Sequence, residues 1–294
     1  MSNKPSELEI YLFDLRGYIV LENALTTDEV AALNAGIDAL LPIEHDEWDG
    51  YIHATNFGAN DGLNLQQIYE GGEAFETLID HPSWFEKVKF FVGGEGNFDY
   101  LHGPLFIDEN LANVRGPGEA IPLHSGGADC VKRCQFLYRN NQFMCGQVNI
   151  LIALTDMMPG DGATMVIPGS HKSNFRHPHF ATAKWEDGDG VDGIIGAEEV
   201  NIKAGDAILF VDAISHGSAK RITAGERRTI VYRYGPSWGN FRHGYQASPE
   251  LLDRLTPQRR QIVHPQKLLE RSPQRIRNAT EISSLVSPNP KEKP

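Results

Sequence analysis

The chain has 294 residues, of which 40% are hydrophobic and 22% charged, and its formal net charge is −12. This composition is typical of a globular protein that can bury a sizeable core. The acidic balance argues against a nucleic-acid-binding protein, because that function needs clustered basic residues to neutralise phosphates, and the sequence contains no such cluster. We therefore expect no nucleic-acid partner.

Cysteine content and apolar runs bear on the compartment. The three cysteines, Cys130, Cys134 and Cys145, are an odd number and do not resemble a disulfide framework. The amino terminus lacks a basic region followed by an apolar one, and the notable run Ile150 to Leu154 is far below the ~20 residues of a spanning helix. We expect a soluble, cytoplasmic protein without a membrane partner, and the sequence does not indicate its oligomeric state.

The amino-terminal part combines a short strand with a helix. Residues 17–22 form a β-branched segment, and Thr26 with Glu29 has the spacing of a capping box, which predicts that a helix begins there. Residues 45–75 are rich in Asp, Gly, Asn and His and have weak periodicity. This composition predicts a long loop region.

From Phe98 onward the pattern changes to short strands bounded by Gly, Pro and Asp. Regular spacing of such strands favours an all-β sandwich or jelly roll over alternating strands and helices. We predict one domain over residues 1–271, with helices mainly before the β core, and a polar tail over residues 272–294. The clearest strand candidates are residues 147–154, 163–167, 206–211 and 229–234.

Fragments of the β region carry the residues of chemical interest. They are Pro122-Leu123-His124-Ser125-Gly126-Gly127, Ile167-Pro168-Gly169-Ser170-His171-Lys172, Gly205 to Phe210, Ser215-His216-Gly217-Ser218, and Arg227 eleven residues after His216. Their order and spacing resemble the phytanoyl-CoA dioxygenase family of Fe(II)/2-oxoglutarate oxygenases. The resemblance extends from the segment at residue 17 to about Tyr234.

The resemblance implies a mainly β protein with flanking helices, built on a double-stranded β-helix (jelly roll, cupin-like). It implies that His124 and His216 bind Fe(II), that Arg227 pairs with the far carboxylate of 2-oxoglutarate, and that Ser218 places a hydroxyl beside that carboxylate. Imidazole suits Fe(II), and a guanidinium fork suits a carboxylate. Arg228 competes with Arg227, but strand alternation admits only one of them to the interior.

The implied reaction oxidises a C–H bond of a small-molecule substrate by hydroxylation, consumes O₂ and 2-oxoglutarate, and releases succinate and CO₂. We expect no catalytic side chain beyond the metal centre. His171 lies in a turn that is not a ligand in the family, and we interpret it as structural. The identity of the substrate cannot be read from the sequence.

The sequence departs from the family at the proximal motif. The usual His-x-Asp reads His124-Ser125-Gly126, and glycine has no side chain that could bind a metal. In one interpretation the vacant position accepts chloride or another halide, as in radical halogenases that resemble this family. In a second, Asp129 folds back as an unconventional ligand, or water fills the position. In a third, the jelly roll binds a ligand without catalysis.

Overall fold

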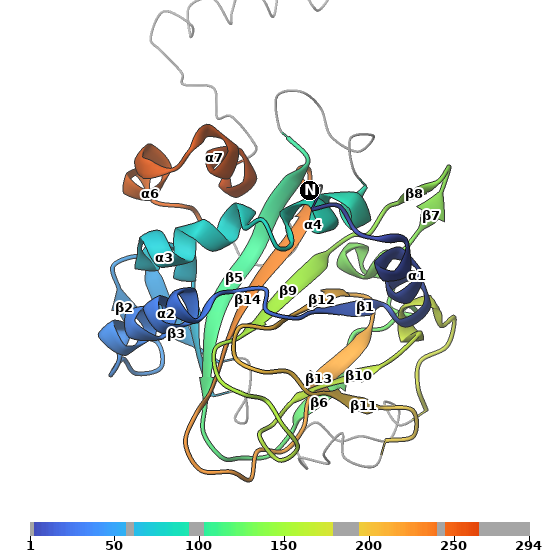
Figure 1. The fold of residues 1–294 in the computed structure, drawn as a ribbon, viewed down its shortest axis with the longest axis horizontal. Helices are drawn as coiled ribbons and strands as arrows, with labels where there is room; N and C mark the ends of the chain where they lie inside the picture. The colour runs from blue at the N-terminus through green and yellow to red at the C-terminus, as the bar shows by residue number, and fades with distance from the viewer. Residues whose placement is uncertain (1–2, 57–61, 94–102, 179–193, 240–244, 265–294) are drawn as a thin grey trace, which may run out of the picture.

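The computed structural model describes residues 3–56, 62–93, 103–178, 194–239 and 245–264, and its strands form two facing antiparallel sheets (Figure 1). Within these ranges the larger sheet has the order β1 (Tyr18–Leu21), β12 (Ala207–Val211), β9 (Val148–Ala153), β14 (Arg227–Pro236), β5 (Leu105–Arg115), β4 (Leu63–Gln66), β3 (Ile52–Thr55), β2 (Trp48–Asp49). The smaller sheet has the order β11 (Glu198–Val200), β10 (Thr164–Ile167), β13 (Ser215–Ser218), β6 (Ile121–His124). Strands β7 (Tyr138–Arg139) and β8 (Gln142–Phe143) pair separately.

Helices flank the sheets, mostly before β5 in the chain (Figure 1). Capping boxes begin the first two, at Ser6 with Glu9 and at Thr26 with Glu29, and the second was predicted. Among the described helices, none combines the length and hydropathy needed to cross a bilayer. The α-helices are α1 (Glu7–Arg16), α2 (Thr27–Leu40), α3 (Glu73–Glu76), α4 (Phe85–Val92), α6 (Pro249–Arg254) and α7 (Pro257–Val263), and the 3₁₀ turns include η1 (Ile68–Gly71), η2 (Thr77–Asp80), η4 (Lys132–Cys134) and η5 (Ser170–Lys172).

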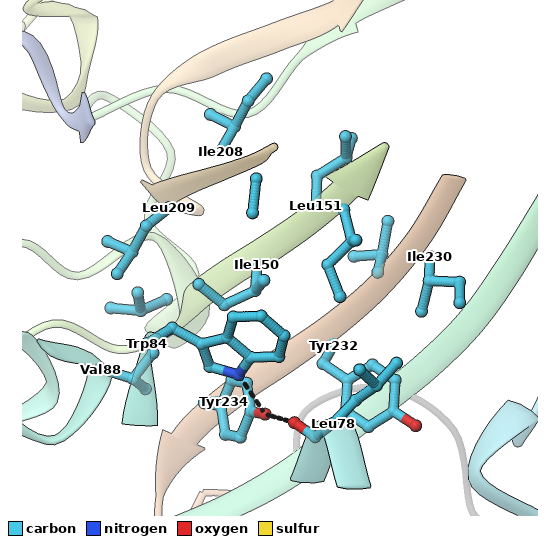
Figure 2. Close-up of a cluster of buried hydrophobic side chains, with 14 of the residues drawn as sticks. Leu78, Trp84, Val88, Ile150, Leu151, Ile208, Leu209, Ile230, Tyr232 and Tyr234 are labelled. Carbon is cyan, nitrogen blue, oxygen red and sulfur yellow. Dashed lines mark hydrogen bonds between the residues drawn. The ribbon is translucent and has the colours of Figure 1, made fainter. Parts of the chain in front are cut away.

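The outer face of the larger sheet packs against the segment that contains α3 and α4. Along β14 this face carries Ile230, Tyr232 and Tyr234, all 0% exposed. Figure 2 shows Trp84 beside Tyr234, where the indole Nε1 donates to the Tyr234 hydroxyl at 3.2 Å. That hydroxyl in turn donates to the Leu78 carbonyl at 3.0 Å. Buried side chains of this size stabilise the fold by roughly 1.5–3 kcal/mol each, so this layer anchors the sheet.

The opposite face, here called the inner face, is turned toward the smaller sheet. On β14 it carries Arg227, Thr229, Val231 and Arg233, because side chains alternate along a strand. Two contacts show that this face meets the smaller sheet. Phe210 of β12 lies 4.9 Å from His216 of β13, measured between ring centroids. Arg115, the register partner of Arg227, donates from Nη1 to Ser218 Oγ of β13 at 2.6 Å.

The apolar middle of the inner face keeps some accessibility. Leu151 and Val231 are each 8% exposed, whereas their outward-facing strand neighbours Ile150, Ile152 and Ile230 are 0% exposed. At these two positions the inner face is therefore slightly more accessible than the outer face.

The predicted jelly roll with flanking helices is confirmed, and each predicted strand segment lies within or overlaps a strand. The predicted loop over residues 45–75 is wrong, because β2, β3 and β4 extend the larger sheet beyond β5 there. These strands have two to four residues each, too few to show alternation in a sequence. The single domain over residues 1–271 stays a prediction, and the tail at 272–294 lies outside the described residues.

Candidate functional site

Two histidines from neighbouring strands of the smaller sheet lie side by side. His124 ends β6, and His216 lies in β13 as its register partner. Their ring centroids are 4.2 Å apart. At ordinary ligand bond lengths near 2 Å, one ion can contact both rings at this separation.

Hydrogen bonds set the tautomer of each imidazole. His124 Nδ1 lies 3.1 Å from the Pro122 carbonyl, and His216 Nδ1 lies 2.7 Å from the Ile214 carbonyl. Because a carbonyl oxygen only accepts, each Nδ1 carries the proton and each Nε2 keeps a lone pair. Burial, and then the neighbouring His124, hold the pKa of His216 well below its ordinary value of 6.5. The neutral ring that a metal needs is therefore the stable form at neutral pH.

The backbone after His124 turns through two left-handed residues. Ser125 has φ 62° and Gly126 has φ 154°. A Cβ at Gly126 would lie 3.2 Å from Ser215 Oγ, and no imidazole atom lies within 4 Å of it. A side chain at this position would therefore be strained and would begin beside Ser215 rather than beside the imidazoles.

Asp129, the unconventional ligand considered above, is held elsewhere. Its Oδ1 accepts from Arg176 Nη2 at 2.6 Å and from Nε at 3.0 Å. Among the described residues no group of three or more His, Cys, Asp or Glu side chains could hold a metal. The structure therefore brings His124 and His216 together but does not bring Asp129 to them.

Arg227 is buried at the far end of the inner face. Its Nη1 donates to Asn113 Oδ1 at 3.2 Å and its Nε to Met157 Sδ at 3.1 Å. In the described part of the chain no carboxylate forms an ion pair with it. Burial, together with Arg115 and Arg221 nearby, lowers the pKa of Arg227 from 12.5 to about 9. This cation therefore stays charged at neutral pH, and the described residues offer it no carboxylate as a counter-charge.

The competition between Arg227 and Arg228 is settled by strand alternation. Arg228 lies on the other side of β14, where it forms ion pairs with Asp38 at 2.7 Å and Glu226 at 2.8 Å. Only Arg227 enters the interior.

Ser218 lies at the same end as Arg227. Its hydroxyl oxygen accepts a hydrogen bond from Arg115 Nη1 at 2.6 Å. The hydroxyl hydrogen of Ser218 can therefore be donated to another group. The sequence interpretation named Ser218 but missed Arg115 and Arg221. The polar residues at alternate positions of β5, Asn113 and Arg115, were the available indication that this strand has a polar inner end.

A pocket of about 410 Å³ opens on the other side of the smaller sheet. Ser125, Gly126, Ile167 and Ser215 are among the residues that line it. Ile167 pairs with Ser215, one residue along β13 from His216, so these side chains point away from the imidazoles. The pocket therefore lies on the face of the smaller sheet that is turned away from the imidazoles.

Comparison with known proteins agrees with this geometry. The family model for phytanoyl-CoA dioxygenase matches residues 13–229. The chain belongs to the phytanoyl-CoA dioxygenase family. It is 32% identical over 242 residues to the ectoine dioxygenase of Nocardia farcinica, which covers 76% of this chain and 75% of that protein. It is 25% identical over 205 residues to dioxygenase cdmD of Talaromyces verruculosus, covering 68% of this chain and only 60% of that relative.

Solved structures show the same fold. HygX from Streptomyces hygroscopicus, with nickel and 2-oxoglutarate bound, matches with a TM-score of 0.66 at 19% identity, covering 84% of this chain and 94% of that one. EctD from S. alaskensis, with 2-oxoglutarate and 5-hydroxyectoine, matches with a TM-score of 0.57 at 22% identity, covering 79% and 76%.

Proposed function

We propose that the protein is a non-haem Fe(II)/2-oxoglutarate-dependent oxygenase that hydroxylates a C–H bond of a small molecule. The observation that carries the proposal is the pairing of His124 with His216, each protonated on Nδ1 so that Nε2 is the ligating nitrogen. The interior of the same fold also holds Arg227, which has no carboxylate partner among the described residues. The two imidazoles can bind iron, and the buried arginine can bind a carboxylate of a 2-oxo diacid.

The donor set fits Fe(II), although it is incomplete. Imidazole nitrogen is a good ligand for Fe(II), and His124 and His216 would hold the ion through Nε2. The described residues supply no carboxylate as a third ligand, so water or a small anion would take that coordination position. The bound metal would supply the redox chemistry that couples O₂ and 2-oxoglutarate to substrate oxidation, with succinate and CO₂ as co-products.

The remaining residues bind and orient the co-substrate. Arg227 would take the distal carboxylate of 2-oxoglutarate through charge-assisted hydrogen bonds, which would provide its missing counter-charge. Ser218 would donate to the same carboxylate, because Arg115 already occupies its acceptor side. The apolar middle of the inner face, with Leu151 and Val231, would limit access of water to the metal.

Relatives support both the co-substrate and the substrate class. HygX has been solved with nickel, 2-oxoglutarate and hygromycin B, and EctD with 2-oxoglutarate and 5-hydroxyectoine. Each of these structures therefore holds a small molecule together with 2-oxoglutarate. We infer a small-molecule substrate for this chain as well.

Anaerobic titration tests the proposal. Fe(II) and 2-oxoglutarate should give a weak visible charge-transfer band with the native protein, and the band should disappear in His216→Ala because one of two protein ligands is lost. Succinate release on exposure to O₂ should fall with it. His45→Ala, at an exposed histidine outside the site, is the control. An undiminished band in His216→Ala contradicts the metal site, and no band in the native protein favours a non-catalytic binder.

A halide outcome has one observation in its favour, the glycine at position 126 with no described carboxylate to replace a ligand. A metal centre with one fewer anionic ligand is more positive and attracts an exogenous anion. Turnover with and without chloride or bromide, followed by product mass, distinguishes halogenation from hydroxylation. A halogen-containing product would replace hydroxylation as the proposed reaction.

A further inference from the structure

The inner face carries a row of polar side chains at the end opposite Arg227. Glu109 of β5, Arg233 of β14, Asn149 of β9 and Phe210 of β12 are successive register partners across four strands. Side chains directly opposite one another point to the same face, so all four share the inner face. We call Glu109, Arg233 and Asn149, together with the adjoining Gln66 and Asp212, the polar row.

The polar row lies near the imidazoles but far from the co-substrate arginine. Phe210, the register partner of Asn149, is the residue whose ring lies 4.9 Å from that of His216. Arg227 and Arg233 are six residues apart on β14, or about 20 Å at the usual rise of a strand. A ligand on the polar row would therefore approach the metal from the side opposite 2-oxoglutarate.

Ion pairs hold the charged members of the row rigidly. Arg233 Nε lies 2.8 Å from Glu109 Oε2, and its Nη1 lies 3.3 Å from Asp212 Oδ1. Arg133 contacts the other oxygen of Asp212 and donates to Ser125 Oγ at 3.0 Å. Both carboxylates are 0% exposed. The charges within this network compensate one another, so recognition by the row depends on its uncharged groups.

The carboxylates fix how two amides are oriented. Asn149 Nδ2 donates to Asp212 Oδ1 at 3.0 Å, and Gln66 Nε2 donates to Glu109 Oε1 at 3.1 Å. Because a carboxylate only accepts, each NH₂ group must face its carboxylate, which leaves each amide oxygen free. Asn149 is 0% and Gln66 1% exposed, and within the described ranges neither amide oxygen has a hydrogen-bond partner.

Two buried acceptors without donors among the described residues are suited to receive hydrogen bonds from a bound molecule. Leaving such a group unpaired costs free energy that a partner's hydrogen bond would recover. Both groups accept, so the partner must bring N–H or O–H donors. An acyl chain could not satisfy them.

We propose that the polar row is the substrate-recognition surface and that the substrate is a small polar molecule bearing hydroxyl or amino groups. The proposal rests on the proposed function, since it assigns the substrate class of the same site. Asn149 Oδ1 and Gln66 Oε1 each accept a hydrogen bond from the substrate, which lies on the side of the metal away from Arg227.

Binding measured on protein loaded with Ni(II) and 2-oxoglutarate tests this. The probes are matched pairs of sugars and amino sugars: glucose and glucosamine, each with its fully O- or N,O-methylated counterpart, and hexanoate as an apolar acyl probe. Thermal shift and calorimetry should show binding only for members with free donors. The comparison of glucosamine with glucose separates amino from hydroxyl recognition.

Two variants assign any binding to the row. Gln66→Met and Asn149→Leu keep approximate volume and remove the amide oxygen, and each should weaken donor-dependent binding about tenfold, as expected for one hydrogen bond. Gln135→Met removes an exposed amide that donates to Met144, outside the row, and is the matched control. If Asn149→Leu does not fold, Gln66→Met decides alone.

The outcomes separate this inference from the proposed function. No donor-dependent binding, equal binding of methylated probes or hexanoate, or equal losses in Gln135→Met would overturn the inference, and water would then be the donor to both oxygens. The visible band with Fe(II) and 2-oxoglutarate, recorded on the same native preparation, reports on the oxygenase separately. A band without donor-dependent binding leaves the oxygenase standing, whereas donor-dependent binding without a band leaves a polar-ligand binder.

Discussion

Arg227 and Arg228 are adjacent in the sequence but differ in burial and in the groups they contact. Arg227 is 4% exposed and its hydrogen bonds go to an amide oxygen and a sulfur, whereas Arg228 pairs with two surface carboxylates. A buried cation of this kind costs stability until an anion reaches it. Substitutions at Arg227 and Arg228 can therefore be compared directly to test which arginine binds the proposed co-substrate.

We expect Arg227→Met to lose the thermal stabilisation that 2-oxoglutarate gives the Ni(II)-loaded protein. The affinity should fall about tenfold or more, because charge-assisted hydrogen bonds are lost. Without ligand, the melting temperature should not fall, since an uncompensated charge has been removed from the interior. Arg228→Met should retain the ligand effect. A normal response in Arg227→Met would exclude it as the carboxylate receptor.

At the scale of strands, the distance between the two imidazoles depends on a glycine. A Cβ at Gly217 of β13 would lie 2.4 Å from the Ile121 carbonyl oxygen and 2.9 Å from that of Pro122. Both are backbone atoms of β6, so a side chain at position 217 would force the two strands apart. His124 and His216 lie on these same strands.

Gly217→Ala should therefore weaken Ni(II) binding measured by calorimetry and lower the unfolding free energy by about 1–3 kcal/mol, the usual cost of overpacking. Gly116→Ala is the control, because a Cβ there has no heavy atom within 4 Å. Unchanged metal affinity in Gly217→Ala would show that the strand spacing does not set the site.

The sequence predicts an element of secondary structure well when the pattern that defines the element lies within a short stretch of residues. The capping box at Thr26 and the buried runs of β9, β12 and β14 are local patterns, and they were predicted. Register is not local, because it links residues far apart in the chain. The sequence could therefore not predict that Arg227 lies opposite Arg115 or that Asn149 donates to Asp212. The order of the motifs did suggest that His124 and His216 come together.

At the scale of the whole molecule, His171 couples stability to pH. It is 2% exposed, and its Nε2 lies 3.1 Å from the Asp14 carbonyl of α1, which fits the structural role expected for it. Burial lowers its pKa from 6.5 to about 4. Between these values the unfolded chain binds a proton that the folded protein does not, so stability falls as pH decreases from 6.5 to 4.

At about 1.4 kcal/mol per pH unit, this histidine accounts for a loss of roughly 3 kcal/mol over that interval. His171→Gln should flatten the dependence of unfolding free energy on pH between 6.5 and 4, measured by urea denaturation at each pH. His45→Gln, a substitution at an exposed histidine, is the control. An equal slope in native protein and His171→Gln would contradict the assignment.

On the proposed function, the buried Arg227 guanidinium, which has no carboxylate partner among the described residues, would also link the protein's persistence to metabolism. A chain whose native state is completed by a diacid unfolds less often when that metabolite is abundant. Proteases remove mainly the unfolded population, so scarcity of the diacid would shorten the protein's lifetime as well as stop its turnover. Its abundance would then follow the supply of its own co-substrate without any dedicated regulator.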